Sequence, residues 1–150
     1  MKYKSAYALS ECLADIAYSF LLQEEVIEDI ILENIVIIPV PSYYKKTKRR
    51  GFNPADKIAE HLADYLEATT NIKTLIKIKK TKAQVETRSK KEREENLKNA
   101  FSTNKNTDLK KNVVLLVDDV ITTGSTMREC SKALKKAGVK EIWGIAIARD

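Results

Sequence analysis

The sequence predicts an α/β fold in which a mostly parallel sheet is flanked by helices. Two apolar runs, residues 35–40 and 113–117, have the pattern of strands that are covered on both faces. Segments with an apolar residue at every third or fourth position alternate with these runs, which is typical of amphipathic helices. Because strand and helix alternate along the chain, a right-handed, doubly wound sheet is the simplest arrangement of these elements.

The first element is a helix that begins near residue 6, and we expect it to pack over the sheet. Its apolar face consists of Ala6, Leu9, Leu13, Ile16, Ala17 and Phe20. The strand at 35–40 follows, and Pro39 and Pro41 stop it because they lack the N–H group that a sheet needs. Asn53 and Pro54 then supply an N-cap and a proline at the first helical position. The apolar face of this second helix consists of Ala55, Ile58, Ala59, Leu62, Ala63 and Leu66.

The second half of the chain begins with a short apolar segment at 75–78, which we expect to be a strand nearer the edge of the sheet. Residues 79–99 are highly charged and lack an apolar period, so we expect a flexible loop with at most one helical turn. The strand at 113–117 leads to a helix from Ser125 that ends at Ala137 and Gly138. Residues 141–148 form the last expected strand. The apolar positions of the helix from Ser125 are Met127, Leu134 and Ala137.

The composition limits the class of protein. At 150 residues the chain suits a single domain, 1–150, that buries roughly two-thirds of its unfolded surface. It has no apolar run of about 18 residues and no secretory leader pattern, so we expect a cytoplasmic protein without a membrane span. Cys12 and Cys130 are too few for a zinc ribbon, and we expect both to be core thiols. The 27 basic and 21 acidic residues give a formal charge of +6, which favours anionic ligands in general.

A polar loop follows the strand at 113–117 and is the most informative part of the chain. Residues 122–126, here called the phosphate loop, combine free N–H groups at a helix start, a permissive glycine and several hydroxyl donors. Those hydroxyls belong to Thr122, Thr123, Ser125 and Thr126, and the glycine is Gly124. Asp118 and Asp119 precede the loop and suit sugar hydroxyls or a bound Mg²⁺. Ser125 stands where a Walker A loop would need Lys, and the remaining alternative is that the two acids merely cap a helix.

Residues 113–126 resemble the phosphoribosyl pyrophosphate (PRPP) signature of the type I phosphoribosyltransferases: an apolar run, two acids, two apolar residues and Thr-Thr-Gly-Ser-Thr. Pro-Val-Pro at 39–41, a basic stretch and Arg-Gly-Phe-Asn at 50–53 are similar to the ComF-like branch of that family, linked to bacterial competence. Further resemblance to this branch lies at 81–84, 93–97, 100–101 and 146–149. The resemblance implies a Rossmann-like, type I phosphoribosyltransferase fold. Pro54 departs from the branch, which usually has Gln there, and the upstream cysteine-rich zinc module common in the branch is absent from this sequence.

The resemblance implies roles for individual residues. Asp118 and Asp119 would hold the ribose hydroxyls and the phosphate loop the 5′-phosphate, while Mg²⁺ would be carried mainly by PRPP rather than by direct protein ligands. Ser42 and Tyr43, in the loop after Pro41, would face the pyrophosphate. The basic candidates for stabilising the departing pyrophosphate are Arg50, Lys90, Lys91 and Arg93. Arg50 lies beside a glycine and can grip a phosphate in two places, whereas the other three are equally well explained as a solvated, charged helix start.

Three functions from different classes are compatible with these features. The first is an enzyme, a glycosyltransferase of nucleotide metabolism that moves a phosphoribosyl group from PRPP to an unknown nitrogen acceptor and releases pyrophosphate. The second is a non-catalytic PRPP or nucleotide-binding module that acts through a competence or DNA-processing protein. The third, direct DNA binding through the basic residues 45–50, ranks last because no nucleic-acid motif accompanies them. The resemblance also allows a homodimer, and the sequence leaves the oligomeric state open.

Overall fold

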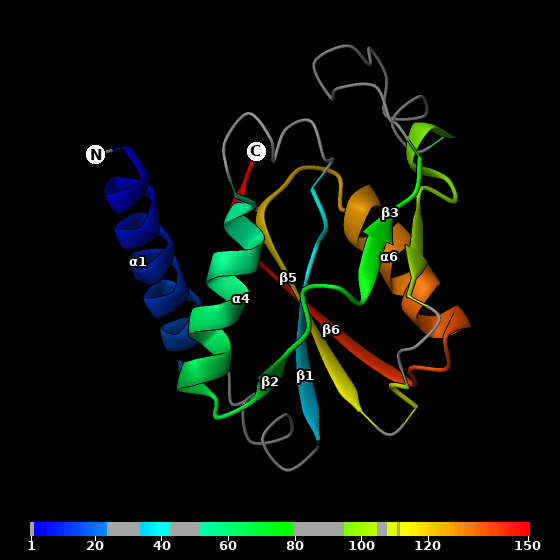
Figure 1. The fold of residues 1–150 in the computed structure, drawn as a ribbon, viewed down its shortest axis with the longest axis horizontal. Coiled ribbons are helices and arrows are strands. Elements are labelled where there is room, and N and C mark those ends of the chain that lie inside the picture. The colour runs from blue at the N-terminus through cyan, green and yellow to red at the C-terminus, as the bar shows by residue number, and fades with distance from the viewer. Residues whose placement is uncertain (1, 24–33, 43–51, 80–94, 105–107, 111) are drawn as a thin grey trace.

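A four-stranded parallel sheet forms the centre of the molecule (Figure 1). The computed structural model describes residues 2–23, 34–42, 52–79, 95–104, 108–110 and 112–150, and the side chains from residue 9 onward. Within these ranges the strand order is β2-β1-β5-β6, and every neighbouring pair is parallel. The strands are β1 (Ile35–Pro39), β2 (Thr69–Thr70), β5 (Val113–Ile121) and β6 (Glu141–Arg149). The predicted α/β fold with a mostly parallel sheet is therefore confirmed.

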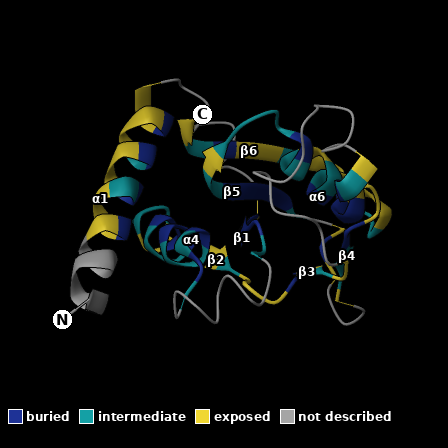
Figure 2. Ribbon diagram, turned by 90° about the horizontal axis from the view of Figure 1, so that it is seen from above, coloured by how far each residue is buried: buried dark blue, intermediate teal, exposed yellow. Residues whose placement is uncertain are grey.

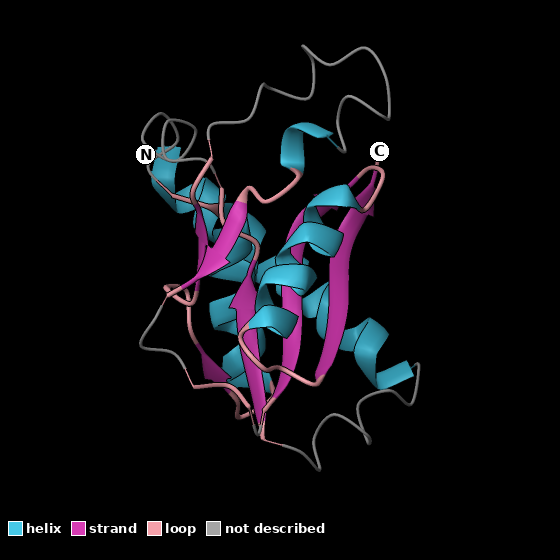
Figure 3. Ribbon diagram, turned by 90° about the vertical axis from the view of Figure 1, so that its right-hand side faces the viewer, coloured by secondary structure: helices cyan, strands magenta, loops and turns pink. Residues whose placement is uncertain are grey.

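Helices cover both faces of the sheet (Figure 3). On one face lie α1 (Lys2–Gln23) and α4 (Pro54–Tyr65), which share an apolar cluster with alternate residues of β1 and β5. On the other face lies α6 (Ser125–Lys136), together with a two-stranded antiparallel sheet of β3 (Leu75–Lys77) and β4 (Phe101–Thr103). Successive side chains of a strand point to opposite faces, so β1 and β5 supply both clusters. This double coverage explains their unbroken apolar sequence.

The core is centred on β5 (Figure 2). Leu115 and Val117 pack toward α4, while Val114 and Leu116 pack toward α6, and each of the four is at most 1% exposed. Ile58 and Leu62 of α4 and Leu134 of α6 are fully buried against them. The predicted apolar face of α4 is confirmed from Ala55 to Ala63, and Leu66 is the half-buried C-cap residue of the helix.

The buried face of α1 differs from the prediction. Leu9, Ile16 and Phe20 are 59%, 54% and 52% exposed, and the buried residues are Ser10, Ala14, Ala17 and Leu21. The helix packs mainly against α4 and also contacts β6, so it covers the sheet at that strand as predicted. Tyr65 of α4 donates a hydrogen bond to Asp15 (2.5 Å). The close approach of α1 to α4 selects a stripe of mainly small residues for burial. Cys12 is exposed as a result, so its prediction as a core thiol was wrong, whereas Cys130 is buried.

One strand prediction also requires correction. Residues 75–77 do not join the main sheet: β3 pairs with β4, and Ile76 and Ile78 are 44% and 62% exposed.

β1 ends at Pro39, as predicted, although Pro39 itself still pairs with Val117 of β5. The N–H of Val40 points to β5, where it donates to Val117 (2.8 Å), so the ring nitrogen of Pro39 faces the β2 side. Since β2 pairs only as far as Ile37, the missing donor of Pro39 costs no sheet hydrogen bond.

Candidate functional site

The two acidic residues lie inside β5 rather than in the loop after it. The predicted strand ended at residue 117, but β5 continues to Ile121, and Asp118 pairs with Ala146 of β6. A hydrogen bond from the Asp150 N–H to the carbonyl of Ile121 (3.0 Å) holds the end of this extension. Pairing with a full-length neighbour keeps β5 extended through its polar residues. The acids are therefore fixed by a sheet, which positions side chains more rigidly than a loop does.

The phosphate loop turns sharply at Gly124. This residue has φ 73°, in the left-handed region that favours glycine, and it is the N-cap residue of α6. The predicted helix start at Ser125 is confirmed. Ser125 is 4% exposed; its Oγ lies 2.7 Å from Thr123 Oγ1, and its N–H donates to the same Thr123 oxygen (3.4 Å). The loop is thus tied to the first turn of α6, where N–H groups without intrahelical partners favour an anion.

Arg128 lies across the phosphate loop and was not among the predicted site residues. Its Nη1 donates to the carbonyl oxygen of Thr123 (3.1 Å) and its Nη2 donates to Ser125 Oγ (3.1 Å). A side chain in a helix leans toward the N-terminal turn, so a residue three positions after Ser125 can contact it. This spacing is visible in the sequence and could have identified Arg128. What the sequence does not give is the tight turn that brings Thr123 into reach.

The carboxylates of Asp118 and Asp119 bend toward the carboxyl end of β5. Asp118 Oδ1 accepts a hydrogen bond from the N–H of Asp119, and Asp119 Oδ1 accepts one from the N–H of Val120, each at 3.0 Å. Burial, then the hydrogen bond and charge of the Asp119 carboxyl, raises the pKa of Asp118 to about 7. Both acids interact with the strand itself and the N-cap of α6 is Gly124, so the interpretation of the acids as helix caps was wrong.

Cys130 lies behind Asp118 on the α6 side of the sheet. Burial raises the pKa of the Cys130 thiol, and the nearby charge of Asp118 raises it further. The thiol therefore stays neutral and belongs to the apolar cluster that α6 shares with Val114 and Leu116. This apolar backing accounts for the desolvation of the Asp118 carboxyl.

The end of β1 lies beside that of β5 at the same edge of the sheet. Pro39 pairs with Val117, so Ser42, which is half-buried, follows β1 at the edge where β5 presents Asp118. Asn53, 7% exposed, donates from Nδ2 to the Val40 carbonyl (3.1 Å) and to Asp56 Oδ1 (2.7 Å), joining this edge to the start of α4. Carboxyl ends of parallel strands are where open α/β sheets bind ligands.

The structure brings part of the predicted site together. The described members at this edge are Ser42, Asp118, Asp119, Thr122, Thr123, Gly124, Ser125 and Thr126. The other predicted members lie outside the described residues: Tyr43, Arg50, Lys90, Lys91 and Arg93. Most of the predicted flexible loop 79–99 also lies outside them. Only residues 79 and 95–99 of it are described, and 95–97 form a helical turn before β4.

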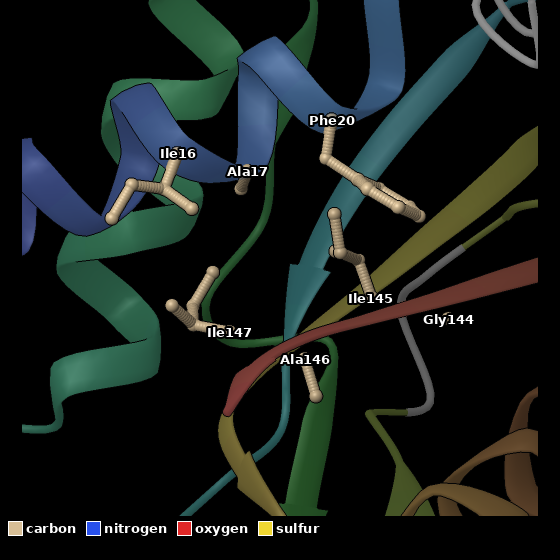
Figure 4. Close-up of a pocket in the computed structure, with 7 residues that line it drawn as sticks. All are labelled: Ile16, Ala17, Phe20, Gly144, Ile145, Ala146 and Ile147. Carbon is tan, nitrogen blue, oxygen red and sulfur yellow. The ribbon is translucent and has the colours of Figure 1, made fainter. Parts of the chain in front are cut away.

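An apolar cavity of about 370 Å³ lies between α1 and β6 (Figure 4). It is lined by Ile16, Ala17, Phe20, Gly144, Ile145, Ala146 and Ile147. None of these is a predicted PRPP ligand, and their side chains offer a sugar phosphate no hydrogen bonds.

Among the described helices, none combines the length and apolar character of a membrane span. Over the same residues, no cluster of three His, Cys, Asp or Glu side chains could hold a metal ion.

Comparisons with known proteins identify the family of this chain. The family model for the phosphoribosyl transferase domain matches residues 20–149. Competence protein F of Haemophilus influenzae is 47% identical over 116 residues, which cover 75% of this chain and 50% of that protein. The DNA utilization protein YhgH of Salmonella typhi is 33% identical over 109 residues, covering 71% of this chain and 47% of that protein. The chain thus spans about half the length of these relatives.

Solved structures show the same fold at lower sequence identity. An allosteric regulatory enzyme of purine biosynthesis superposes with a TM-score of 0.58 at 21% identity, covering 94% of this chain and 26% of that one. A hypoxanthine phosphoribosyltransferase from Staphylococcus aureus gives 0.53 at 12% identity, covering 91% of this chain and 62% of that one. Three findings agree: the match to the family model, the similarity to competence protein F and YhgH, and the shared fold. The chain therefore belongs to the phosphoribosyl transferase domain family.

Proposed function

We propose that this domain binds PRPP at the carboxyl edge of its main sheet and transfers the phosphoribosyl group to a nitrogen nucleophile, releasing pyrophosphate. The observation that carries the proposal is the continuity of β5, the phosphate loop and α6. It brings a pair of carboxylates and the start of a helix to one edge of the sheet. Carboxylates accept hydrogen bonds from sugar hydroxyls, whereas helix N-termini bind phosphate. A phosphorylated sugar needs both at this close spacing.

PRPP would lie with its 5′-phosphate on the phosphate loop and its ribose over Asp118 and Asp119. Two features support this orientation: the hydroxyl pair of half-buried Thr123 and buried Ser125, and the αL turn at Gly124. Together they form a tight turn with N–H and O–H donors. The end of β1, with Ser42, would face the pyrophosphate. This orientation directs C1 of the ribose, where the bond breaks, toward the segment that follows β1.

Mg²⁺ fits this site as a companion of PRPP. Carboxylate oxygens and phosphate oxygens are ligands that Mg²⁺ prefers, and Asp118 and Asp119 provide carboxylates beside the ribose position. The ion would neutralise charge on the pyrophosphate group when bound. In this proposal it enters with PRPP, and the two carboxylates lie near it.

The side chains have separate roles in the transfer. Loss of pyrophosphate leaves positive charge on the ribose and negative charge on the leaving group. The carboxylates of Asp118 and Asp119 hold the ribose hydroxyls, so the sugar stays oriented while the bond at C1 breaks. The donors that stabilise the departing pyrophosphate are still predictions, and they are Arg50, Lys91 and Arg93. Replacing each by Ala in turn and measuring pyrophosphate affinity tests that part of the assignment.

A second candidate is a PRPP-binding module without catalysis that acts through a protein partner in competence or DNA use. The names of the relatives, competence protein F and DNA utilization protein, favour this context. Their greater length provides room for partner contacts beyond the matched region. Cytoplasmic location, a single domain over residues 1–150 and a homodimer remain predictions within either candidate.

The deciding experiment is calorimetric titration with PRPP and Mg²⁺. The parent chain is compared with Asp118→Asn and Asp119→Asn, and Asp64→Asn serves as a matched control because this acid is exposed on α4. We expect saturable binding in the parent and the control and a loss of about tenfold or more in each site variant, since each loses a carboxyl oxygen that would accept a hydrogen bond from a ribose hydroxyl. Equal binding by all four proteins would contradict the site assignment. Pyrophosphate release with a panel of amines and bases then separates the enzyme from the binding module.

A further inference from the structure

We propose that Arg128 is a positioning residue that holds the phosphate loop in the shape that receives a phosphate. The inference rests on the proposed function for its ligand, but its structural basis is independent of it. One guanidinium joins two points of the loop, the Thr123 carbonyl and Ser125 Oγ, each at 3.1 Å. Those two points flank Gly124, the residue with the left-handed backbone. Arg128 thus closes a ring of hydrogen bonds around the turn from β5 into α6.

The hydroxyl pair inside this ring shows how the hydrogen bonds of Arg128 prepare the loop for a ligand. Thr123 Oγ1 and Ser125 Oγ lie 2.7 Å apart, so one of their two hydrogens is used between them. Arg128 donates to the Ser125 oxygen and the N–H of Ser125 donates to the Thr123 oxygen. Protein donors therefore occupy an acceptor position on each oxygen. Within the part of the chain that the structure describes, one hydroxyl hydrogen remains for a ligand, and the fitting ligand is an acceptor such as a phosphate oxygen.

The geometry favours arginine over lysine. A guanidinium has several N–H donors in a fixed plane and can donate to a carbonyl and a hydroxyl at the same time. An ammonium is a compact charge on a flexible stem, so it retains the charge without the fork. A Cβ added at Gly124 would lie 3.6 Å from Arg128 Nη1, in ordinary contact, which shows how closely the guanidinium covers the turn. Arg128→Lys therefore separates positioning from simple attraction of an anion.

The inference is tested with three variants: Arg128→Gln, Arg128→Lys and, as a control, Lys135→Gln. Lys135 is an exposed basic residue in the last turn of α6, away from the phosphate loop. Hydrogen exchange of the amides of Thr123, Gly124 and Ser125 measures loop order without any ligand. We expect about tenfold faster exchange in both Arg128 variants and parent-like exchange in the control, because the loop loses charge-assisted hydrogen bonds in the first two.

Titrations with ribose 5-phosphate and with pyrophosphate complete the test. We expect both Arg128 variants to bind ribose 5-phosphate about tenfold more weakly and pyrophosphate as the parent does, since only the first ligand uses the phosphate loop. General damage to the fold would weaken the binding of both ligands. Parent-like amide exchange in Arg128→Gln, or full ribose 5-phosphate binding in Arg128→Lys, would overturn the positioning role. If the parent binds neither ligand, the proposed function fails, and amide exchange still decides the role of Arg128.

Discussion

Asp118 is a site residue whose acid–base chemistry the fold changes strongly. Its carboxyl is desolvated against the apolar cluster under α6 and lies beside a second carboxyl, so its pKa rises from 3.8 to about 7. An acid in this position lowers the stability of the folded chain whenever it is ionised, because burial penalises the charge. Ligand-binding sites often retain residues that lower the stability of the fold, since the same charge is needed to recognise the ligand. Asp118 therefore links the stability of the domain to its proposed activity.

The stability of the domain should depend on pH through Asp118. A carboxyl with a raised folded pKa binds its proton more tightly in the folded state, so its stabilising contribution is full below about pH 4 and is lost as pH rises through about 7. Asp118→Asn removes this titration. We expect the Tm of the variant to exceed that of the parent at about pH 8 and to approach it at about pH 4. Thermal melts of both proteins measure this, and a Tm difference that does not change with pH would contradict it.

Gly124 should be sensitive to substitution because of its backbone conformation rather than its space. A Cβ at this position would make ordinary contacts at 3.6 Å with Arg128 Nη1 and Ile121 Cδ1, but φ is +73°. We expect Gly124→Ala to reduce the free energy of unfolding by about 1–2 kcal/mol. Gly124→Asn should lose less, because Asn tolerates the left-handed region better. Urea denaturation compares the two, and equal losses would show that backbone conformation is not the cause.

At the scale of elements, the sheet edge depends on the connection between β1 and α4. Asn53 is buried, precedes Pro54 at the start of α4, and donates to the Val40 carbonyl at the end of β1. It also donates to Asp56, whose pKa is nevertheless raised by burial, with the Asn53 hydrogen bond opposing that rise. One side chain thus satisfies a strand end and a partly buried acid in the first turn of the helix.

Removing this connection should destabilise the domain measurably. We expect Asn53→Ala to lower the free energy of unfolding by about 1–3 kcal/mol, because the Val40 carbonyl and the Asp56 carboxylate lose a buried donor. Asn104→Ala is the matched control, since Asn104 is exposed at the end of β4. Chemical denaturation measures both. A loss of under about 0.5 kcal/mol in Asn53→Ala, the range of ordinary surface changes, would show that water replaces these hydrogen bonds.

At the scale of the whole molecule, two apolar clusters lie on opposite faces of one sheet (Figure 2). β1 and β5 contribute side chains to both clusters, so neither face can be lost without disturbing the strands that support the other. The site lies at the end of those same strands. Its geometry therefore depends on both helical layers.

Shortening a buried side chain in either apolar cluster should destabilise the whole domain, which we expect to unfold in a single cooperative transition. Leu62 of α4 and Leu134 of α6 are both 0% exposed, and we expect Leu62→Ala and Leu134→Ala each to lose about 2–5 kcal/mol. Since the sheet is shared, unfolding followed by Trp143 fluorescence and by far-ultraviolet circular dichroism should coincide in both variants. Separate transitions by the two probes would show that the layers unfold independently. Leu22→Ala, at a residue 50% exposed, is the control.

Much of the fold and the described site was predictable from local sequence patterns. The apolar runs of β1 and β5 identified strands covered on both faces, and the periodicity after Pro54 and Ser125 identified α4 and α6. The short strands β2 and β4 were not predicted, because segments of two or three residues carry too little pattern. The face of α1 was predicted wrongly because apolar residues occur on more than one side of that helix, and packing against α4 selects among them.

By itself, the sequence determined the fold class, the order of its main elements and the motif from Asp118 to Thr126, because all three depend on neighbours along the chain. The tertiary structure alone decided the extension of β5 through the acids, the raised pKa of Asp118 and the contact of Arg128 with Thr123. Those features depend on β6 pairing alongside, on the apolar layer under α6 and on a turn through a left-handed glycine. Such conditions arise only when segments distant in sequence pack together, since burial and hydrogen-bond geometry are properties of the assembled fold.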